Sequence, residues 1–395
     1  MAAARRPILV GPPSARASYI FNSPLPPMSH LTRRRFLGNV STLAALTLAP
    51  RLSWGADHPP VGRKLGVALV GLGGYSRGQL GPALRETKYC QLAGVVTGDR
   101  AKGLKWAQDY GFPATNIYNY STMAQLANNP AIDIVYVVTP NGLHAEHCIA
   151  AAKAGKHVIC EKPMANTVAE CDAIIAACRA AGVQLTIGYR LFFDPHHAEL
   201  RRLAREEDFG PFTQMSGERG FVMSTWRWRA DRVLAGGGPL MDLGVYLIQG
   251  ACMAKNGAKP VAVTAQELPK TRPDISRDTE EALRWTMEFA DGAQADLMAS
   301  YQQGADRFRA DGARGWIHFK EHAFTYRGMV VETSRGPLKF APPNQQALQM
   351  DAFAQSVLTG APSPAPGEMG RRDLTIIEAI YASMAAGGQR VVVKV

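Results

Sequence analysis

A glycine-rich turn provides the first residues whose types and spacing could do chemistry. Residues 71–76 read Gly-Leu-Gly-Gly-Tyr-Ser, between a short apolar run and a helical pattern. Glycines at such a turn let a pyrophosphate approach the backbone, and the free N–H groups at the start of the next helix attract its negative charge. Ser76 is small enough to replace the third glycine of the fingerprint. Because a strand precedes the turn and a helix follows it, the pattern predicts a dinucleotide-binding site.

The end of the second predicted strand indicates which dinucleotide binds. Thr97 ends this strand, and Arg100 and Lys102 follow just beyond it. An acid at the strand end would hold a ribose 2′-hydroxyl, whereas a hydroxyl residue followed by two cations suits a 2′-phosphate. The sequence therefore favours NADP. Asp99 could turn toward the ribose, which leaves NAD as the alternative.

Three further polar positions could belong to the same site. Residues 139–144 (Thr-Pro-Asn-Gly-Leu-His) and 161–163 (Glu-Lys-Pro) each follow a predicted strand, at the edge where doubly wound sheets bind ligands. Asp242 and Tyr246 follow a second glycine-rich turn and, four residues apart, share one face of a predicted helix. Taken singly, each of these could equally be a helix cap, a surface loop or a core side chain.

The elements that must position these residues alternate in the first half of the chain. Apolar strands separated by helices predict a parallel sheet covered on both faces, a Rossmann-type α/β domain over residues 64–188. The predicted strands are 65–70, 91–97, 132–138, 157–160 and 184–187, with helices ending near 86 and over 100–110, 144–154 and 168–181.

After about residue 190 strands follow one another without helices between them. The pattern predicts an α+β domain over 189–343 with a large, mostly antiparallel sheet, and Asp291-Gly292 predicts a two-residue hairpin turn. Residues 344–395 are predicted to form helices that pack back on the first domain. The predicted strands are 261–266, 282–289, 293–300 and 316–319, and the predicted late helices are 344–358 and 371–386.

Together these motifs resemble the glucose–fructose oxidoreductase / inositol dehydrogenase / rhizopine-catabolism (Gfo/Idh/MocA) family of NAD(P)-dependent oxidoreductases. The resemblance runs from about Lys64 to Val393, and Glu-Lys-Pro at 161–163 is its most specific motif. Most members have histidine at the position of Tyr246, whereas tyrosine there resembles the glucose–fructose oxidoreductase branch. The stretches 118–121, 188–190, 194–195 and 226–227 are similar to that branch as well.

The resemblance implies roles for individual residues. In the family the lysine of Glu-Lys-Pro lies beside the nicotinamide and hydrogen-bonds the reacting hydroxyl, a role that falls here to Lys162. The implied dinucleotide contacts are Gly71, Gly73, Gly74, Tyr75, Ser76, Thr97, Arg100, Lys102, Tyr120, Pro140, Asn141, His144, Glu161, Lys162, Tyr189, Arg190, Trp226 and Arg227. The predicted catalytic and sugar-binding residues are Lys162, Asp242, Tyr246, Tyr301 and Tyr326, without a metal.

The implied activity is hydride transfer from C1 of a cyclic aldose to NADP, giving a lactone. A phenol with a pKa near 10 stays protonated at neutral pH and cannot act as a base unaided, but the ammonium of Lys162 would favour the phenolate and lower that pKa. We predict that Tyr246 takes the hydroxyl proton, Lys162 orients the hydroxyl and Asp242 positions the sugar. The same residues in reverse would reduce a second sugar, a ketose or an aldose.

Three other functions remain open at this point. A conventional NAD(P)-dependent aldose 1-dehydrogenase would release its reduced cofactor. An exported NAD-dependent glycosidase would be expected to carry histidine motifs where this chain has Asp242 and Tyr246, and a non-catalytic binding protein would not need Lys162 with them. One departure from the branch concerns residues 56–63, which are shorter than the Pro-rich arm that covers the cofactor there, so retention of NADP must come from elsewhere or be weaker.

Composition and charge limit the classes of protein and of binding partner that fit this sequence. The 395 residues are 46% hydrophobic and 19% charged, which excludes a disordered or fibrous protein. Seven arginines and no acids in residues 1–55 account for most of the net charge of +11, since the remainder has 37 basic against 33 acidic residues. This removes the main argument for nucleic-acid binding. The family resemblance favours a homo-oligomer, a dimer or tetramer.

The N-terminus predicts export. Thr-Arg-Arg-Arg-Phe-Leu at 32–37 precedes a weakly apolar run, 40–50, too short to span a bilayer. An arginine pair followed by Phe-Leu resembles a twin-arginine signal, with cleavage expected after Gly55 and a periplasmic destination. Met28 suits the start of such a signal, so residues 1–27 need not be translated. Substrates of this route are thought to cross folded, and the six cysteines are accordingly predicted to be buried free thiols.

Overall fold

The computed structural model describes residues 63–394 and contains a parallel sheet in its first half. Within these residues the sheet has six strands in the order β3-β2-β1-β4-β5-β6, all parallel. All six residues of β1 are buried, as its unbroken apolar sequence predicts. The strands are β1 (Leu65–Val70), β2 (Cys90–Val96), β3 (Ile117–Tyr118), β4 (Ile134–Val137), β5 (His157–Cys160) and β6 (Leu185–Ile187).

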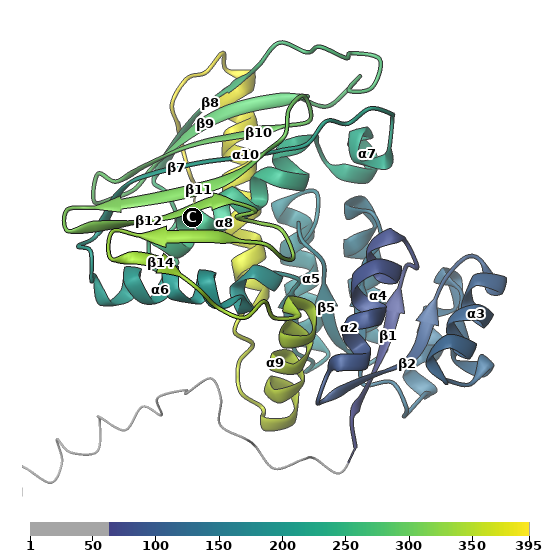
Figure 1. Cartoon of the computed structure of the whole chain (residues 1–395). Coiled ribbons are helices and arrows are strands. Elements are labelled where there is room, and N and C mark those ends of the chain that lie inside the picture. The colour runs from purple at the N-terminus through teal and green to yellow at the C-terminus, as the bar shows by residue number, and fades with distance from the viewer. Residues whose placement is uncertain (1–62, 395) are drawn as a thin grey trace, which may run out of the picture. The chain divides into compact units, whose positions relative to one another are not determined.

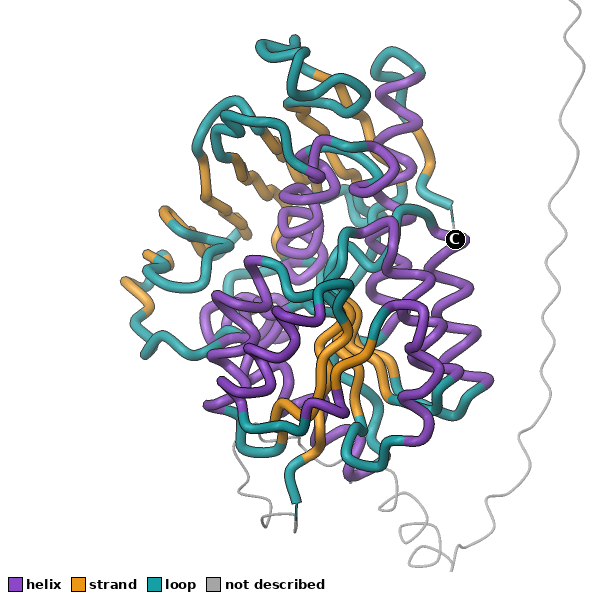
Figure 2. Tube along the Cα trace, turned by 90° about the vertical axis from the view of Figure 1, so that its right-hand side faces the viewer, coloured by secondary structure: helices purple, strands orange, loops and turns teal. Residues whose placement is uncertain are grey.

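Helices cover both faces of the parallel sheet, which Figure 2 shows between purple helical segments. The dinucleotide turn leads into a π-helical turn, Ser76–Leu80, before the α-helix continues. A capping box at Thr167 and Glu170 begins α5. The helices of this half are α2 (Gly81–Glu86), α3 (Arg100–Tyr110), α4 (His144–Lys153) and α5 (Val168–Ala180), with a 3₁₀-helix at Tyr120–Asn128.

The second half is built on a large mixed sheet (Figure 1). Its nine strands, counted within the described residues, run in the order β14-β13-β12-β11-β7-β10-β9-β8-β15, and only β7 and β10 pair in parallel. The strands are β7 (Phe212–Gly220), β8 (Ala262–Glu267), β9 (Ala282–Glu288), β10 (Gln294–Ser300), β11 (Ala305–Gly312), β12 (Gly315–Glu321), β13 (Val330–Thr333), β14 (Gly336–Leu338) and β15 (Val391–Val392). The predicted fold class, a Rossmann domain followed by an α+β domain, is confirmed.

One face of the large sheet packs on helices and the other is open. Side chains alternate along β10, with Ala295, Leu297 and Ala299 buried, as a sheet covered on one side requires. Helix α8 (Val245–Ala254), which carries Tyr246, contacts β7 and β11, and α6 (Pro195–Glu206) packs on α8. A short helix, α7 (Arg232–Ala235), precedes α8.

The structure corrects some expected elements. The β9–β10 hairpin forms, but its loop is three residues, 290–292, because Phe289 N–H bonds to the Ala293 carbonyl and Gly292 adopts a φ of +83°. The predicted two-residue turn is therefore wrong. Two elements were not predicted from the sequence. Helix α6 was not predicted, although Asp194-Pro195 caps it. Strand β7 was not predicted because its many polar side chains conceal the strand pattern.

Two late helices join the halves. Helix α9 (Gln345–Thr359) packs beside β2, where Asp351 accepts the N–H groups of Lys88 and Tyr89 at 2.9 Å each. Helix α10 (Gly367–Ala385) contacts α5, β6, α8 and β8, and begins four residues before the predicted start at 371. The chain then ends in β15, which pairs with β8 in the large sheet.

All six cysteines are buried and none forms a disulfide. Burial raises the pKa of the Cys178 and Cys252 thiols to about 12, so both stay protonated and unreactive near neutral pH. The predicted export signal, residues 1–55, lies outside the described residues. Within residues 63–394 no helix is long and apolar enough to cross a membrane.

Candidate functional site

The glycine-rich turn after β1 has room for a phosphate group. Gly71 adopts a φ of +96°, and a side chain there would approach Thr139 to 3.1 Å, so the turn lies close to the end of β4. Side chains at Gly73 and Gly74 would meet nothing within 4 Å, which leaves open space on that side of the turn. Ser76 is buried and donates its hydroxyl to the Gly71 carbonyl at 2.6 Å. This open turn fits the pyrophosphate of a dinucleotide.

The junction of β2 and α3 carries the residues predicted to choose between NAD and NADP. The Asp99 side chain accepts the Lys102 N–H at 3.0 Å and caps α3, while the Thr97 hydroxyl accepts the Asp99 N–H at 3.1 Å. Arg100 and Lys102 are exposed and have no ion-pair partner among the described residues. Tyr120 lies beside this junction, near Gly98. Two free cations beside a capping acid suit a 2′-phosphate.

The loop after β4 is held mainly by buried contacts. His144 is buried, and its two ring nitrogens face the carbonyl oxygens of Thr139 and Pro163, at 2.8 Å and 3.0 Å. Burial disfavours the imidazolium, but Cys160 and the two carbonyls outweigh it and raise the pKa of His144. The buried Asn141, next to Pro140, donates to the Ala235 carbonyl at 2.9 Å. The side chains of Asn141 and His144 thus tie this loop to its neighbours.

Glu161 fixes the position of Lys162. Its buried carboxylate accepts the Tyr136 hydroxyl at 2.7 Å and the Lys162 N–H at 3.1 Å. Burial raises the pKa of Glu161. Because both carboxylate oxygens have donors within the chain, Glu161 orients the backbone from which the lysine extends.

Lys162, Asp242 and Tyr246 come together as predicted from their motifs. The Lys162 ammonium donates to the Asp242 carbonyl oxygen at 2.7 Å and lies 3.7 Å from its carboxylate. It also lies 4.2 Å from the centre of the Tyr246 ring, so it faces the ring rather than the hydroxyl. Lys162 and Asp242 are mostly buried, with 11% and 18% of their side chains exposed.

Local backbone geometry brings Asp242 and Tyr246 to one side. Residues Leu240–Gly244 form a π-helical turn rather than the predicted α-helix, and α8 starts at Val245. The glycines before the turn permit close packing: a side chain at Gly237 would overlap the Tyr381 hydroxyl, and one at Gly238 the Glu280 carbonyl. Such π-turns are frequent at functional sites because they re-aim side chains within a helix.

Three cations surround the Tyr246 ring. Besides Lys162, the guanidinium of Arg219 lies 4.5 Å and that of Arg190 5.3 Å from the ring centre, and Arg190 also approaches the hydroxyl at 3.4 Å. Burial raises the pKa of Tyr246, but the positive charges of Lys162, Arg190 and Arg219 outweigh it and hold the pKa below the ordinary value of about 10. Tyr246 is therefore better suited to act as a base than a free phenol.

Asp242 has two further partners: Arg229, which the motifs did not reveal, and Tyr301, which was predicted to line the sugar pocket. Arg229 pairs with its carboxylate at 3.1 Å, and Tyr301 donates its hydroxyl at 3.2 Å. Burial raises the pKa of Asp242, but Arg229 and Lys162 outweigh it, so the pKa is lowered and the carboxylate stays charged. Burial and the Asp242 charge raise the pKa of Tyr301 well above its usual range, which keeps it a donor.

We call Lys162, Asp242, Tyr246 and the side chains that contact them the Tyr246 cluster. The other predicted residues lie partly in this cluster and partly elsewhere in the fold. Tyr326 joins the cluster, with the Arg190 guanidinium 4.3 Å from its ring centre. The side chain of Tyr189 instead donates to Asp373 of α10 at 2.6 Å and is buried.

Trp226 and Arg227 are exposed, and their side chains make no hydrogen bond, ion pair or ring contact among the described residues. The chain repeats Trp-Arg at 228–229, and that second arginine is the one that reaches Asp242. Arg219 gave no such signal: it is one charged residue in a polar strand.

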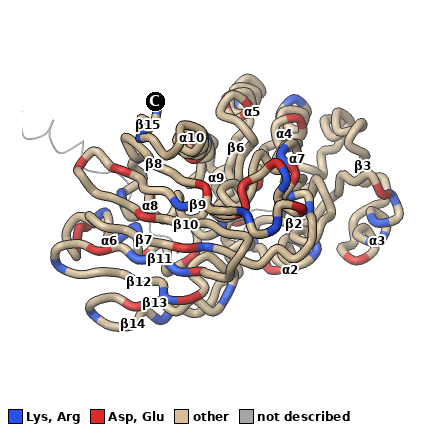
Figure 3. Tube along the Cα trace, turned by 90° about the horizontal axis from the view of Figure 1, so that it is seen from above, with Lys and Arg blue, Asp and Glu red and all other residues tan. Residues whose placement is uncertain are grey.

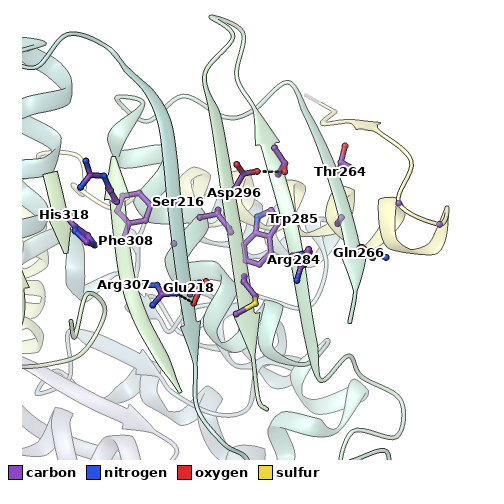
Figure 4. Close-up of a pocket in the computed structure, with 18 residues that line it drawn as sticks. Ser216, Glu218, Thr264, Gln266, Arg284, Trp285, Asp296, Arg307, Phe308 and His318 are labelled. Atoms are coloured by element: carbon purple, nitrogen blue, oxygen red, sulfur yellow. Dashed lines mark hydrogen bonds and ion pairs between the residues drawn. The ribbon is translucent and has the colours of Figure 1, made fainter. Parts of the chain in front are cut away.

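A separate hollow of about 1050 Å³ lies on the open face of the large sheet (Figure 4). Its lining includes Glu218 and Arg307, which pair at 2.7 Å, and none of Lys162, Asp242 and Tyr246. Lys and Arg are interspersed with Asp and Glu over this sheet (Figure 3). The hollow is therefore distinct from the cluster around Tyr246.

Comparisons with known proteins agree with this geometry. Residues 65–189 match the model of the oxidoreductase family with an NAD-binding Rossmann fold, and residues 197–318 match the GFO/IDH/MocA C-terminal domain. The solved structure of an aldose-aldose oxidoreductase from Caulobacter crescentus, in complex with glycerol, is 39% identical, with a TM-score of 0.80, covering 84% of this chain and all of that one.

Two curated relatives extend the comparison. A trans-1,2-dihydrobenzene-1,2-diol dehydrogenase from Xenopus laevis is 32% identical over 61% of this chain and 70% of the relative. A D-xylose 1-dehydrogenase [NADP(+)] from Haloarcula marismortui is 25% identical over 80% of this chain and 89% of the relative. These matches confirm the predicted family and the NAD(P) cofactor, whose phosphates the open turn at Gly73 and Gly74 fits. The chain belongs to the Gfo/Idh/MocA family of NAD(P)-dependent oxidoreductases.

Proposed function

We propose that this protein oxidises an aldose at C1 to a lactone and reduces the carbonyl of a second sugar, using an NADP that stays bound between the two steps. The observation that carries the proposal is the environment of Tyr246, a phenol beside Lys162, Arg190 and Arg219 with a pKa below its ordinary value. The similarity to an aldose-aldose oxidoreductase supports sugars on both sides of the reaction.

The residues of the cluster divide the work of proton transfer. When bound, the nicotinamide supplies the acceptor and donor of the hydride. The Tyr246 phenolate takes the proton of the C1 hydroxyl, and the Lys162 ammonium donates a hydrogen bond that orients the same oxygen. In the second half-reaction Tyr246 returns the proton to the carbonyl oxygen of the acceptor sugar. Asp242, kept charged by Arg229 and Lys162, is placed to accept a sugar hydroxyl.

The charged residues at the junction of β2 and α3 favour NADP as the cofactor. Arg100 and Lys102 are free to pair with a 2′-phosphate, whereas Asp99 is engaged in capping α3. Two relatives, the D-xylose 1-dehydrogenases of Haloarcula marismortui and Haloferax volcanii, carry NADP in their names. These same relatives favour one alternative function, a conventional NADP-dependent aldose 1-dehydrogenase that exchanges its cofactor at each turnover.

Turnover without added cofactor separates the two functions. Purified protein would be given glucose with fructose, and separately xylose alone, and the sugar acid and polyol formed per enzyme molecule would be measured. Many turnovers are expected. If product forms only with added NADP, and NADPH accumulates, the protein is an ordinary dehydrogenase instead.

The variant Tyr246→Phe tests whether Tyr246 is the base in the proposed proton transfer. It keeps the ring but removes the base, so turnover should fall by about 10²- to 10⁴-fold while the bound cofactor remains. Unchanged turnover would remove Tyr246 from the mechanism.

We also propose that the protein is exported by the twin-arginine route and acts as a homo-oligomer. The arginine pair within residues 33–35 and the six unpaired, buried thiols support export after folding in a reducing compartment. Oligomerisation rests on the family resemblance, and sedimentation velocity would test it. An exported enzyme has no external supply of NADP, which is consistent with a retained, internally recycled cofactor.

A further inference from the structure

A stacked pair of tyrosines joins the dinucleotide turn to a loop of the large sheet. Tyr75 follows Gly73 and Gly74 in the turn after β1, and Tyr326 lies in the loop between β12 and β13. Their ring centres are 6.3 Å apart and the ring planes differ by 29°. We call this pair the tyrosine bridge. It brings together residues about 250 positions apart in the chain, from the two halves that a bound dinucleotide would contact.

Each end of the bridge is held by further contacts. The hydroxyl of Tyr75 accepts a hydrogen bond from Gln346, at the start of α9, at 3.3 Å. The loop that carries Tyr326 is fixed by the buried Arg190, which donates to the carbonyls of Phe324 and Thr325 at 2.6 Å and 3.0 Å. The bridge is therefore supported on both sides by residues that do not depend on a ligand.

The tyrosine bridge lies next to the place where a dinucleotide would bind. On one side lies the open space beside Gly73 and Gly74, where a pyrophosphate fits. On the other side Arg190 contacts both the Tyr326 ring and Tyr246, at 4.3 Å and 5.3 Å from the ring centres. The bridge thus lies between the phosphate turn and Tyr246, where the pyrophosphate and the nicotinamide of one dinucleotide would be held.

Tyr326 has features of a contact that can open. Its ring is 37% exposed, and its hydroxyl makes no hydrogen bond among the described residues. Burial and the neighbouring Tyr246 raise its pKa to about 12, so the hydroxyl stays uncharged throughout the working range. What holds it is ring contact alone, with Tyr75 and with Arg190.

We propose that the tyrosine bridge closes over the bound dinucleotide and slows its release. This assigns Tyr326 to cofactor retention rather than to the sugar pocket. This inference rests on the proposed function, because slow release helps only an enzyme that uses the same NADP in both half-reactions. Loss of one aromatic pair should accelerate release of the dinucleotide roughly tenfold.

The test compares Tyr326→Ala with Tyr326→Phe. The alanine variant removes the ring and the phenylalanine variant keeps it, and the hydroxyl that Phe loses has no partner. NADPH would be bound to each protein and its release followed by nicotinamide fluorescence after mixing with excess NADP. We expect release roughly ten times faster from Tyr326→Ala and unchanged from Tyr326→Phe. Equal release rates for wild type and Tyr326→Ala would overturn the proposal.

Two controls keep the result interpretable. Phe340→Ala removes an exposed ring that contacts His196, away from the bridge, and should leave NADPH release unchanged. Tyr326→Leu keeps an apolar side chain and should behave like the alanine variant if aromatic stacking matters. A leucine variant that retains NADPH as the wild type does would also overturn the proposal.

The proposed function can fail without the bridge failing. If wild type is purified without nucleotide and needs added NADP, the retained-cofactor function is wrong. The dissociation constant for NADPH still tests the bridge in that case: Tyr326→Ala should bind about tenfold more weakly than wild type and Tyr326→Phe equally well. Equal constants for all three proteins would contradict the bridge.

Discussion

The proposed chemistry of the site depends on the balance of charge around one side chain, Tyr246. Burial by itself would make Tyr246 a weaker acid, yet Lys162, Arg190 and Arg219 lie close enough to its ring to reverse that effect. Acids are present nearby as well, since Glu161 opposes the shift. The net result is a phenol whose charged form is favoured where a base is needed.

Arg219 is the cation of this group that can be removed with least disturbance to the dinucleotide turn. It lies on β7, pairs with Asp306 at 2.9 Å and faces the Tyr246 ring. Arg219→Met should raise the pKa of Tyr246, because it removes one of the three positive charges that lower it. Because the base is the deprotonated form, the rising limb of kcat against pH should move to higher pH, and the rate at neutral pH should fall about tenfold.

Two variants control for this prediction. Arg219→Lys keeps the charge and should restore most of the wild-type pH profile. Arg307→Met removes an arginine from the neighbouring strand β11, but this one is exposed and pairs with Glu218 on the open face. Its pH profile should match wild type. A similar shift in Arg307→Met would mean that net charge, and not proximity to Tyr246, controls the rate.

The motifs could predict Lys162, Asp242 and Tyr246, but not all of their partners. Each predicted residue stands in a local pattern with glycines or a proline at fixed spacing. Arg219 and Arg229 reach the cluster from segments whose approach depends on how β7 and the following loop fold over α8. Of these two arginines, only Arg229 belongs to a recognisable sequence pattern, the repeated Trp-Arg pair at 226–229.

Among the elements, the first turn of α3 should set the cofactor preference. Arg100 and Lys102 are exposed and unpaired there, while Asp99 is occupied as the cap. The double variant Arg100→Ala/Lys102→Ala should weaken NADP binding at least tenfold and leave NAD binding nearly unchanged, because only NADP carries the 2′-phosphate. Fluorescence titration with NADPH and NADH measures both constants.

Lys105→Ala offers a matched control on the same helix. Lys105 pairs with Asp109 at 3.1 Å on the exposed surface, one turn farther along α3. Its loss should alter neither constant. Equal weakening of NADPH and NADH in the double variant would show that the two cations act through general attraction and do not recognise the 2′-phosphate.

Helix α10 should stabilise the arrangement of the two halves through one carboxylate. Asp373 is fully buried and accepts from Tyr189 at 2.6 Å, from Gln249 of α8 at 2.9 Å and from Arg372 at 2.8 Å. Asp373→Ala leaves Arg372 without its partner in a largely buried position. The free energy of unfolding should fall by about 3–5 kcal/mol, measured by denaturant titration.

Arg371→Ala tests whether burial is the cause. This neighbouring arginine pairs with Asp172 on the exposed side of α10 at 2.6 Å. Its removal should cost less than about 1 kcal/mol, since water screens such pairs. A comparable loss in both variants would contradict the role given to Asp373.

Strands are easier to predict from the sequence in the first half of the chain than in the second. Strands buried on both faces, such as β1 and β4, are unbroken apolar runs and are visible directly. Strand β7 has one open face and reads Phe-Thr-Gln-Met-Ser-Gly-Glu-Arg-Gly, so its alternation is weak. The β9–β10 loop shows a different limit, because Asp-Gly fits both a two-residue turn and the three-residue loop that forms.

The protein as a unit combines a mildly basic enzyme with a strongly basic N-terminal segment. Interspersed charges cover the large sheet, whereas residues 1–55 carry seven arginines and no acid. If those residues direct export of the folded chain, all six cysteines should still be thiols after arrival in an oxidising compartment, because each is buried before it leaves the cytoplasm.

Replacing the arginine pair tests this account of export. Arg33→Lys/Arg34→Lys keeps the positive charge but removes the residues that the twin-arginine receptor reads, so precursor should remain in the cytoplasm, as fractionation and immunoblotting would show. Arg51→Lys changes an arginine outside the pair in the same region and should have no effect. Alkylation of the exported protein without reductant should label six cysteines after unfolding. Normal export of the Arg33/Arg34 variant, or fewer than six free thiols in the exported protein, would show that the chain does not cross the membrane already folded by this route.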